Sequence, residues 1–271
     1  MDQLHEKDRK LRRDLQKLGS AAVAFSGGVD STFLLKTAAE VLGSKTAAIT
    51  ASSVFIPAWE QEEAARFCRE NGIRHIVVPV DVLSVRGVAA NPPDRCYLCK
   101  KALFSRFLEE AEKLGIPFVA EGSNMDDLGD YRPGLKAISE LGILSPLRDA
   151  GLGKQEIRTL SREMGLPTWD KPSYACLASR FVYGEAISPE KLAMVEKAED
   201  KLRSMGLRQL RVRLHDDLAR IEAEPDRILF LAEKREEICS VFHSLGFRYV
   251  TLDLDGFASG SMNRVLEKTE P

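Results

Sequence analysis

A glycine-rich turn near the start of the chain carries residue types that bind phosphate. Residues 21–24 are a short apolar run, which predicts a buried parallel strand, and an apolar-faced helix is expected just after the turn. Backbone N–H groups of such a turn and a helix N-terminus favour an anion, and glycine permits close approach and positive φ angles. The candidate phosphate-binding residues are Ser26, Gly27, Gly28, Asp30, Ser31 and Thr32. This order predicts a phosphate loop rather than a plain connecting turn.

An acid in this loop indicates which phosphate chemistry to expect. A Walker-type loop has a lysine directly before the hydroxyl residue, whereas this chain has Asp30 there. A carboxylate beside phosphates is suited to holding Mg²⁺ on released pyrophosphate. The motif Ser-Gly-Gly-x-Asp-Ser resembles the pyrophosphatase loop (PP-loop) of the ATP-pyrophosphatases. Members of that family cleave ATP between the α and β phosphates to make an adenylated intermediate.

Three cysteines form a second set of chemical groups. Cys96 and Cys99 have C-x-x-C spacing at an expected loop-to-helix junction, a pattern used by zinc sites, redox dithiols and clusters alike. Cys176 lies close to a cationic residue, which favours a nucleophilic thiolate. Three cysteines together suit a [4Fe–4S] cluster with one open iron. Cys68 and Cys239 are instead expected to be small core residues.

Two arginines near residue 212 share one face of an expected strand. Arg211 and Arg213 are two residues apart, so their guanidinium groups can grip a phosphate or a carboxylate together. Glu222, on the next expected strand, could face them. A solvated charged strand has the same spacing, and the sequence leaves both interpretations open.

The first two thirds of the chain alternate between apolar strands and amphipathic helices. Strands are expected at 46–50, 73–80 and 118–122, and helices at 4–18, 58–71 and 100–114. This alternation predicts an α/β fold with a parallel sheet covered on both faces, in which ligands lie beyond the C-terminal strand ends. The phosphate loop, Ser52 and Gly122 stand at such ends and are expected to meet in one crevice.

The pattern changes near residue 185 to that of a small α+β domain. A capped helix is expected at 188–206, strands at 209–214 and 218–222, a helix at 225–245 and a strand at 249–254. We therefore expect two domains, residues 1–184 and 185–271. A module as small as the second buries little core by itself, so docking or oligomerisation is expected.

Composition narrows the class of protein. The chain has 271 residues, 30% of them charged, with a formal net charge of −2, which argues against a long nucleic-acid footprint. Its apolar runs are too short to span a bilayer, and its first residues lack a secretory apolar segment, so a cytoplasmic protein is expected. Five cysteines, an odd number, do not indicate a disulfide framework.

These residues together resemble the LarE family, and the resemblance extends over nearly the whole chain. It is carried by the PP-loop, by Glu121-Gly122-Ser123-Asn124, by Pro-Ser-Tyr-Ala-Cys-Leu-Ala-Ser-Arg around Cys176 and by Arg211-Val212-Arg213. It implies an adenine nucleotide alpha hydrolase-like PP-loop domain and a small C-terminal domain that assembles into trimers or hexamers. LarE proteins are ATP-dependent sulfur transferases of nickel-pincer nucleotide cofactor synthesis. They adenylate the carboxylates of pyridinium-3,5-biscarboxylic acid mononucleotide and replace oxygen with sulfur, which gives the thiocarboxylic acid.

The family has two versions of this chemistry. In one, the cysteine matching Cys176 gives up its own sulfur and becomes dehydroalanine. In the other, three cysteines hold a [4Fe–4S] cluster whose additional sulfide is delivered, so that turnover is possible. The presence of Cys96 and Cys99 beside Cys176 favours the cluster version here.

The resemblance also implies roles for single residues. The PP-loop residues bind the phosphates of ATP with Mg²⁺, and Ser52 and Gly122 lie near the adenosine. Residues that hold the phosphate and carboxylates of the substrate are Ser179, Arg180, Arg211, Arg213 and, as the residue that orders them, Glu222. Other interpretations are a PP-loop tRNA thiolase, which needs a broad basic surface, an ammonia-using ligase, and a non-catalytic nucleotide sensor with a structural zinc.

Overall fold

The computed structural model describes residues 2–129, 133–258 and 261. Contacts divide the chain into two compact units: unit 1 comprises Met1–Val85 and Asp94–Tyr174, and unit 2 comprises Arg86–Pro93 and Ala175–Pro271. Residues 175–184, which the sequence pattern assigned to the first domain, are thus grouped with unit 2. Cys176 therefore belongs to unit 2.

Unit 1 contains the expected parallel sheet. Its strands are β1 (Ala21–Ala24), β2 (Thr46–Ser52), β3 (Arg74–Pro79) and β4 (Val119–Ala120). All three pairings are parallel, and the order across the sheet is β3-β2-β1-β4. Because β1 lies between β2 and β4, the phosphate loop that follows it leaves the sheet between two neighbouring strand ends, which confirms the predicted arrangement.

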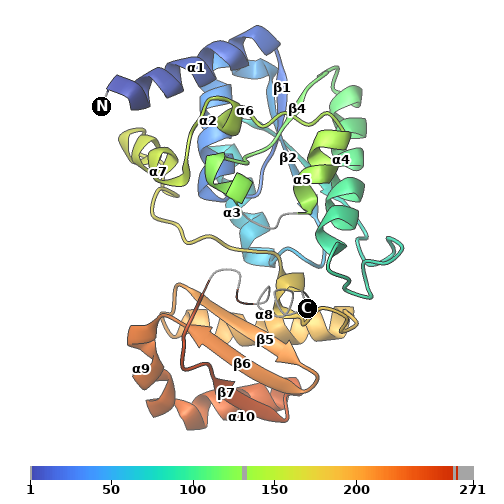
Figure 1. Ribbon diagram of the computed structural model, residues 1–271, viewed down its shortest axis with the longest axis vertical. Helices are drawn as coiled ribbons and strands as arrows, with labels where there is room; N and C mark the ends of the chain where they lie inside the picture. The colour runs from blue at the N-terminus through green and yellow to red at the C-terminus, as the bar shows by residue number, and fades with distance from the viewer. Residues whose placement is uncertain (1, 130–132, 259–260, 262–271) are drawn as a thin grey trace, which may run out of the picture. The chain divides into compact units, whose positions relative to one another are not determined.

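Helices cover both faces of this sheet. Successive strand residues point to opposite faces, so each strand contributes side chains to both apolar cores. Val23 and Ala48 pack in one apolar core with α1 (Asp2–Leu18) and α2 (Val29–Leu42), and Ala22 and Ile49 pack in the other with α4 (Arg95–Lys113). Figure 1 shows α4 on one side of the sheet and α2 on the other. The remaining helices of unit 1 are α3 (Ala58–Glu70), α5 (Gly134–Glu140), α6 (Pro146–Asp149) and α7 (Lys154–Glu163), and a 3₁₀ turn, η2, spans Met125–Gly129.

Unit 2 is the predicted α+β module with one difference. It contains η3 (Leu177–Arg180), α8 (Pro189–Ser204), β5 (Leu210–His215), β6 (Leu218–Ala223), η4 (Pro225–Arg227), α9 (Ile228–Glu233), α10 (Arg235–Leu245) and β7 (Tyr249–Leu252). β5 pairs antiparallel with β6, and β6 pairs parallel with β7. The single helix expected at 225–245 is wrong, because η4, α9 and α10 occupy this stretch with a break at Lys234.

The start of α8 follows the sequence signal. Ser188 caps the helix by accepting a hydrogen bond from the Lys191 N–H at 3.3 Å, and Pro189 occupies the first helical position. Within the described residues, no helix combines the length and the apolar character needed to cross a membrane.

Candidate active site

Hydrogen bonds among its own residues fix the shape of the phosphate loop between β1 and α2. Ser26 Oγ lies 3.1 Å from Ser31 Oγ, and the Gly28 N–H donates to Ser26 Oγ at 3.4 Å. Ser31 Oγ also donates to the Gly28 carbonyl at 3.2 Å. Gly27 has a φ of +70°, which explains the need for glycine there. Thr32, also predicted to bind phosphate, is fully buried, and its N–H donates to the Gly28 carbonyl.

The end of β4 packs directly against this loop. A Cβ added at Gly122 would lie only 3.0 Å from Ser31 N and 3.3 Å from the Asp30 carbonyl carbon, so even a methyl group there would push against the backbone of the loop. Ser52, at the end of β2, is partly exposed. The structure thus brings Gly122 and the loop together, as expected for two segments that follow the carboxyl ends of neighbouring strands.

Asp30 is the electrostatic centre of the loop. Its carboxylate forms an ion pair with Lys154, the first residue of α7. Burial raises the pKa of Asp30, while the Lys154 ammonium opposes this rise; Asp127 adds to it and Arg158 also opposes it. Asp30 Oδ1 is buried and has no hydrogen-bond partner among the described residues. An oxygen in this state fits a ligand of Mg²⁺ bound to ATP phosphates, because Mg²⁺ commonly takes one carboxylate together with phosphate oxygens.

Acidic side chains accept hydrogen bonds from the backbone around Lys154 and hold it in place. Its N–H donates to Asp126 Oδ2 at 2.8 Å, and the preceding Gly153 N–H donates to Glu156 Oε2 at 2.9 Å. Glu156 in turn pairs with Lys7 of α1 at 2.7 Å. The side chain of Lys154 is therefore delivered to Asp30 from a well-anchored helix start.

A second lysine reaches the loop from a later segment. Lys171 Nζ donates to the Gly27 carbonyl at 2.9 Å and pairs with Glu63 at 2.6 Å, and it also lies 5.4 Å from the Trp59 ring centre. Arg158 donates to the Lys171 carbonyl at 2.7 Å and so fixes this segment. Two ammonium groups thus lie at the phosphate loop, and neither was predicted from the sequence.

Glu121, the acid directly before Gly122, has a structural role. Glu121 is buried and accepts hydrogen bonds from Ser123 Oγ at 2.8 Å and from Ser145 Oγ at 2.6 Å. These bonds satisfy its carboxylate and order the chain that follows β4. The carboxylate therefore supports Gly122 at its close contact with the loop.

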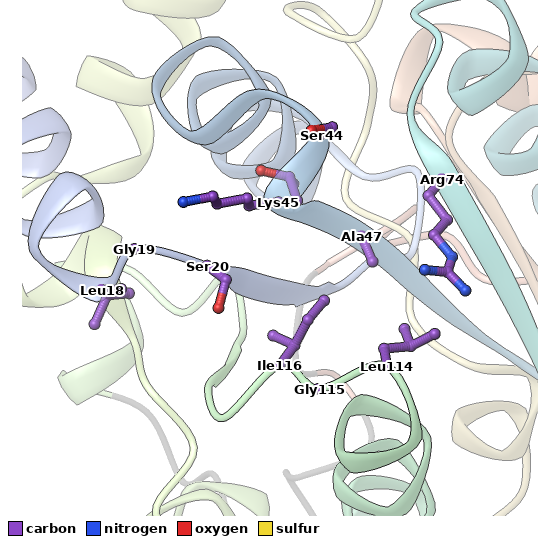
Figure 2. A pocket seen from close by; sticks show the side chains of 11 residues that line it. Leu18, Gly19, Ser20, Ser44, Lys45, Ala47, Arg74, Leu114, Gly115 and Ile116 are labelled. Carbon is purple, nitrogen blue, oxygen red and sulfur yellow. The ribbon is translucent and has the colours of Figure 1, made fainter.

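A cavity of about 500 Å³ lies where the strands of the unit 1 sheet begin, at the end opposite to the phosphate loop. Figure 2 shows side chains around it, including Lys45 just before β2 and Arg74 at the start of β3. The phosphate loop lies at the carboxyl ends of the strands, so this cavity is separate from the candidate site. Helices α1 and α4 end at its rim, and the two cationic side chains complement such C-termini.

The cysteines occupy different environments. Cys96 and Cys99 are one turn apart near the start of α4 and partly exposed, and Arg95 Nη2 donates to Cys96 Sγ at 3.7 Å. Cys68 lies in the core, where burial raises the pKa of its thiol to about 12, as expected of a core cysteine. Cys239 is only partly buried, so the core position expected for it is wrong.

Cys176 is exposed and lies in unit 2, whereas the C-x-x-C pair lies in unit 1. Among the residues that the structure describes, no group of three or more His, Cys, Asp or Glu side chains is arranged to hold a metal ion. The donor chemistry nevertheless fits an iron–sulfur cluster, since three accessible thiols are the ligands it takes.

The arginine pair of unit 2 is buried, which excludes the interpretation of this strand as a solvated charged strand. Arg211 and Arg213 are only 3% and 4% exposed. Arg213 donates to Glu222 Oε2 and to the Ser179 carbonyl, both at 2.8 Å, while Arg211 lies 5.0 Å from the ring centre of Phe257. Arg213 Nε is buried and makes no hydrogen bond within the described part of the chain, so it fits an anion such as a phosphate oxygen.

Arg180 differs from the other predicted substrate ligands. It is 1% exposed, and its guanidinium donates to both carboxylate oxygens of Glu199 at 2.8 and 2.9 Å. Its remaining nitrogen, Nη1, donates to the carbonyl of Cys176 at 3.0 Å. Glu199 was not predicted from the sequence, although one signal was available: it falls on the apolar face of α8 with Leu192, Val195 and Leu202, where an acid needs a buried partner.

The parallel sheet and its Ser-Gly-Gly-x-Asp-Ser loop define the class: this is a PP-loop protein of the adenine nucleotide alpha hydrolase-like fold. No protein-family model matches the chain. It is 41% identical over 259 residues to pyridinium-3,5-bisthiocarboxylic acid mononucleotide synthase of Lactiplantibacillus plantarum, covering 95% of this chain and 93% of that protein. The chain belongs to the family of this synthase, LarE.

Two other relatives agree with this placement. An uncharacterised protein of Synechocystis is 44% identical over 98% of this chain and 100% of its own length. A glutamine-hydrolysing GMP synthase component of Thermoplasma acidophilum is 28% identical over 69% of this chain and 65% of its own length. Similarity to this second enzyme fits membership of the wider PP-loop class.

Proposed function

We propose that the protein is an ATP-dependent sulfurtransferase that converts pyridinium-3,5-biscarboxylic acid mononucleotide into the thiocarboxylic acid. The observation that carries the ATP-dependent part is Asp30: a buried carboxylate of the phosphate loop with one oxygen unpartnered among the described residues and a lysine beside it. The product class is supported by the name of the Lactiplantibacillus plantarum relative, which matches over nearly the whole chain.

The first step is adenylation of a substrate carboxylate. The carboxylate oxygen attacks the α-phosphorus, the bond between the α and β phosphates breaks, and pyrophosphate leaves. A carboxylate is already ionised at pH 7, so this attack needs no general base. Backbone N–H groups of the loop, with Lys154 and Lys171, stabilise the negative charge that develops on the leaving group. Asp30 would hold Mg²⁺, which when bound neutralises the β and γ phosphates.

Substrate recognition is assigned to unit 2. The mononucleotide carries one phosphate and two carboxylates, and the buried Arg211 and Arg213 offer two guanidinium groups on one strand face. Ser179 adds a hydroxyl, and Glu222 orients Arg213 through their 2.8 Å bond. Arg213 Nε makes no hydrogen bond to a described residue, so it can donate one to a bound anion.

For the sulfur, we propose that Cys96, Cys99 and Cys176 hold a [4Fe–4S] cluster. These three thiolates would hold the cluster, and the chemistry that it would supply is sulfide for the adenylated carboxyl group, from which AMP would leave. The second candidate is the sacrificial version at Cys176. The exposed position of that thiol favours it, because an accessible sulfur can reach the acyl carbon without a cluster.

The remaining proposals concern partners. We expect the protein to act in the cytoplasm, as a homo-oligomer, on a small molecule. Its formal net charge of −2 supports a small-molecule substrate over RNA.

Anaerobic assay of the purified protein with Mg-ATP and the pyridinium mononucleotide tests this function. We expect AMP, pyrophosphate and thiocarboxylic acid to form in step, with no stimulation by bulk tRNA. Stimulation by tRNA, or AMP formation that does not depend on the pyridinium compound, would overturn the assignment. A colourless protein that binds only zinc would support the nucleotide sensor instead.

A further inference from the structure

Glu199 of α8 is a buried carboxylate that no step above uses. It is 0% exposed, and its two oxygens accept hydrogen bonds from Arg180 at 2.8 and 2.9 Å, from Arg203 at 2.9 Å and from the Val212 N–H at 3.0 Å. Although burial raises the pKa of Glu199, Arg180 together with Arg203 and Val212 holds it below its ordinary value. Glu199 is therefore an ionised anchor.

Arg180 connects this anchor to the turn that carries Cys176. Two nitrogens of its planar guanidinium are fixed by Glu199, so the direction of the third, Nη1, is fixed as well. Nη1 donates to the carbonyls of Ala175 and Cys176, at 2.5 and 3.0 Å, and to Ser179 Oγ at 3.1 Å. One side chain thus holds three acceptors that flank the thiol on both sides.

A second buried arginine holds the other end of the same turn. Arg213, paired with Glu222, donates to the Ser179 carbonyl at 2.8 Å, and the Ser179 N–H donates to the Cys176 carbonyl at 3.0 Å. Phe181, just beyond the turn, forms a parallel bridge with Leu214 of β5. The turn is rigidly supported from beneath, while Cys176 itself is exposed.

A buried ion pair of this kind is a poor source of net stability, because desolvation offsets most of the attraction. Its value here is geometric, since an apolar pair could fill the space but could not hold the carbonyls of residues 175 and 176. We propose that Glu199, acting through Arg180, is a positioning residue that holds the Cys176 turn in the geometry required for sulfur transfer. This rests on the proposed function for the transfer step, but the ordering of the turn can be measured without it.

The test compares Glu199→Gln with the wild-type protein, purified anaerobically at full length. Hydrogen–deuterium exchange should become faster by about tenfold or more in the peptide covering residues 175–181, with α10 unchanged as the reference in the same unit. The thiocarboxylic acid formed per AMP should fall by about tenfold to a hundredfold, because small misplacements of a reacting group have effects of this size. With the substrate at saturating concentration, AMP formation should stay within about twofold, because the phosphate loop of unit 1 is not altered.

Two further variants keep the result clear. Arg203→Gln removes another cation from the same carboxylate but leaves the bond between Glu199 and Arg180, so we expect an unchanged product ratio. Arg180→Lys retains the charge but not the three-way bonding, and should reproduce the Glu199→Gln result; it also serves if Glu199→Gln does not fold. Faster exchange in α10 as well would show that Glu199 only stabilises the unit and would overturn the proposal. An unchanged product ratio in both Glu199→Gln and Arg180→Lys would overturn it too. If the wild type forms no AMP, the proposed function fails, and the exchange result alone judges the positioning of the turn.

Discussion

Replacing Asp30 by asparagine should stabilise the folded protein and strongly reduce the release of pyrophosphate from ATP. Burial raises the pKa of Asp30 above its ordinary value of 3.8, despite the opposing charge of Lys154. A carboxyl with a raised pKa binds more protons in the folded than in the unfolded protein. Its favourable contribution is therefore fully present below its unfolded pKa and is lost as the pH rises through the folded pKa. At neutral pH the ionised carboxylate is destabilising, and asparagine removes this charge without changing the volume.

The size of the effect follows from the surroundings of the carboxylate. The side chain is 21% exposed, and one of its oxygens is buried without a hydrogen bond to any described residue. Substitutions that remove an unfavourable charge commonly stabilise a protein by about 0.5–2 kcal/mol. The loss of the ion pair takes away little, because Lys154 is 27% exposed and its ammonium can turn to water. For a chain of this size, about 1 kcal/mol corresponds to a melting temperature higher by about 2–4 °C.

Thermal melts at pH 7 and pH 4 and a pyrophosphate-release assay measure both effects. Asp30→Asn should melt above the wild type at pH 7, and the difference should shrink at pH 4, where the wild-type carboxyl becomes protonated. Pyrophosphate release should fall by about a hundredfold or more, as when one charge-stabilising group is removed from an active site. A lower melting temperature at pH 7, or retained pyrophosphate release, would refute this account of Asp30.

Asp14 provides the matched control. It lies on α1, where hydrogen bonds from Lys17 and Lys10 lower its pKa, so its contribution has the opposite sign. Stability from Asp14 is present above its unfolded pKa and is lost as the pH falls through the folded pKa. Asp14→Asn should therefore not raise the melting temperature at pH 7, and pyrophosphate release should be unchanged.

The phosphate loop was predictable from sequence because its signal is local. An apolar run, two glycines and a hydroxyl-rich helix start are contiguous, and the alternation of strands with helices predicts a parallel sheet whose carboxyl ends carry the ligand. Lys154 and Lys171 were not predictable. They reach the loop from 124 and 144 residues further along the chain, and a contact at such a separation leaves no spacing pattern.

The arginines of unit 2 show the same limit in another form. The i, i+2 spacing correctly placed Arg211 and Arg213 on one strand face, but only packing reveals that both are buried. Arg180 was noticed as a cation near Cys176, yet its bonding depends on Glu199, which is 19 residues away on another helix. Local sequence identified the chemical groups, and tertiary contacts decide which of them face a ligand.

Three further variants test other parts of the site. Gly122→Ala adds a methyl group 3.0 Å from the first turn of α2, so stability should fall by about 1–3 kcal/mol in thermal melts and pyrophosphate release should fall with it; Gly134→Ala, which meets only a flexible lysine side chain, should leave release unchanged. Lys171→Met removes an ammonium from the loop and should weaken ATP binding by about tenfold in calorimetry, and unchanged binding would limit Lys171 to a structural role. Finally, Cys96→Ser distinguishes the two sources of sulfur. A cluster that needs three thiolates is lost in this variant, so repeated sulfur transfer should stop while AMP formation continues. A sacrificial mechanism does not involve Cys96, so one sulfur per chain would still be transferred, and mass spectrometry would then find dehydroalanine at Cys176; that outcome would refute the cluster proposal.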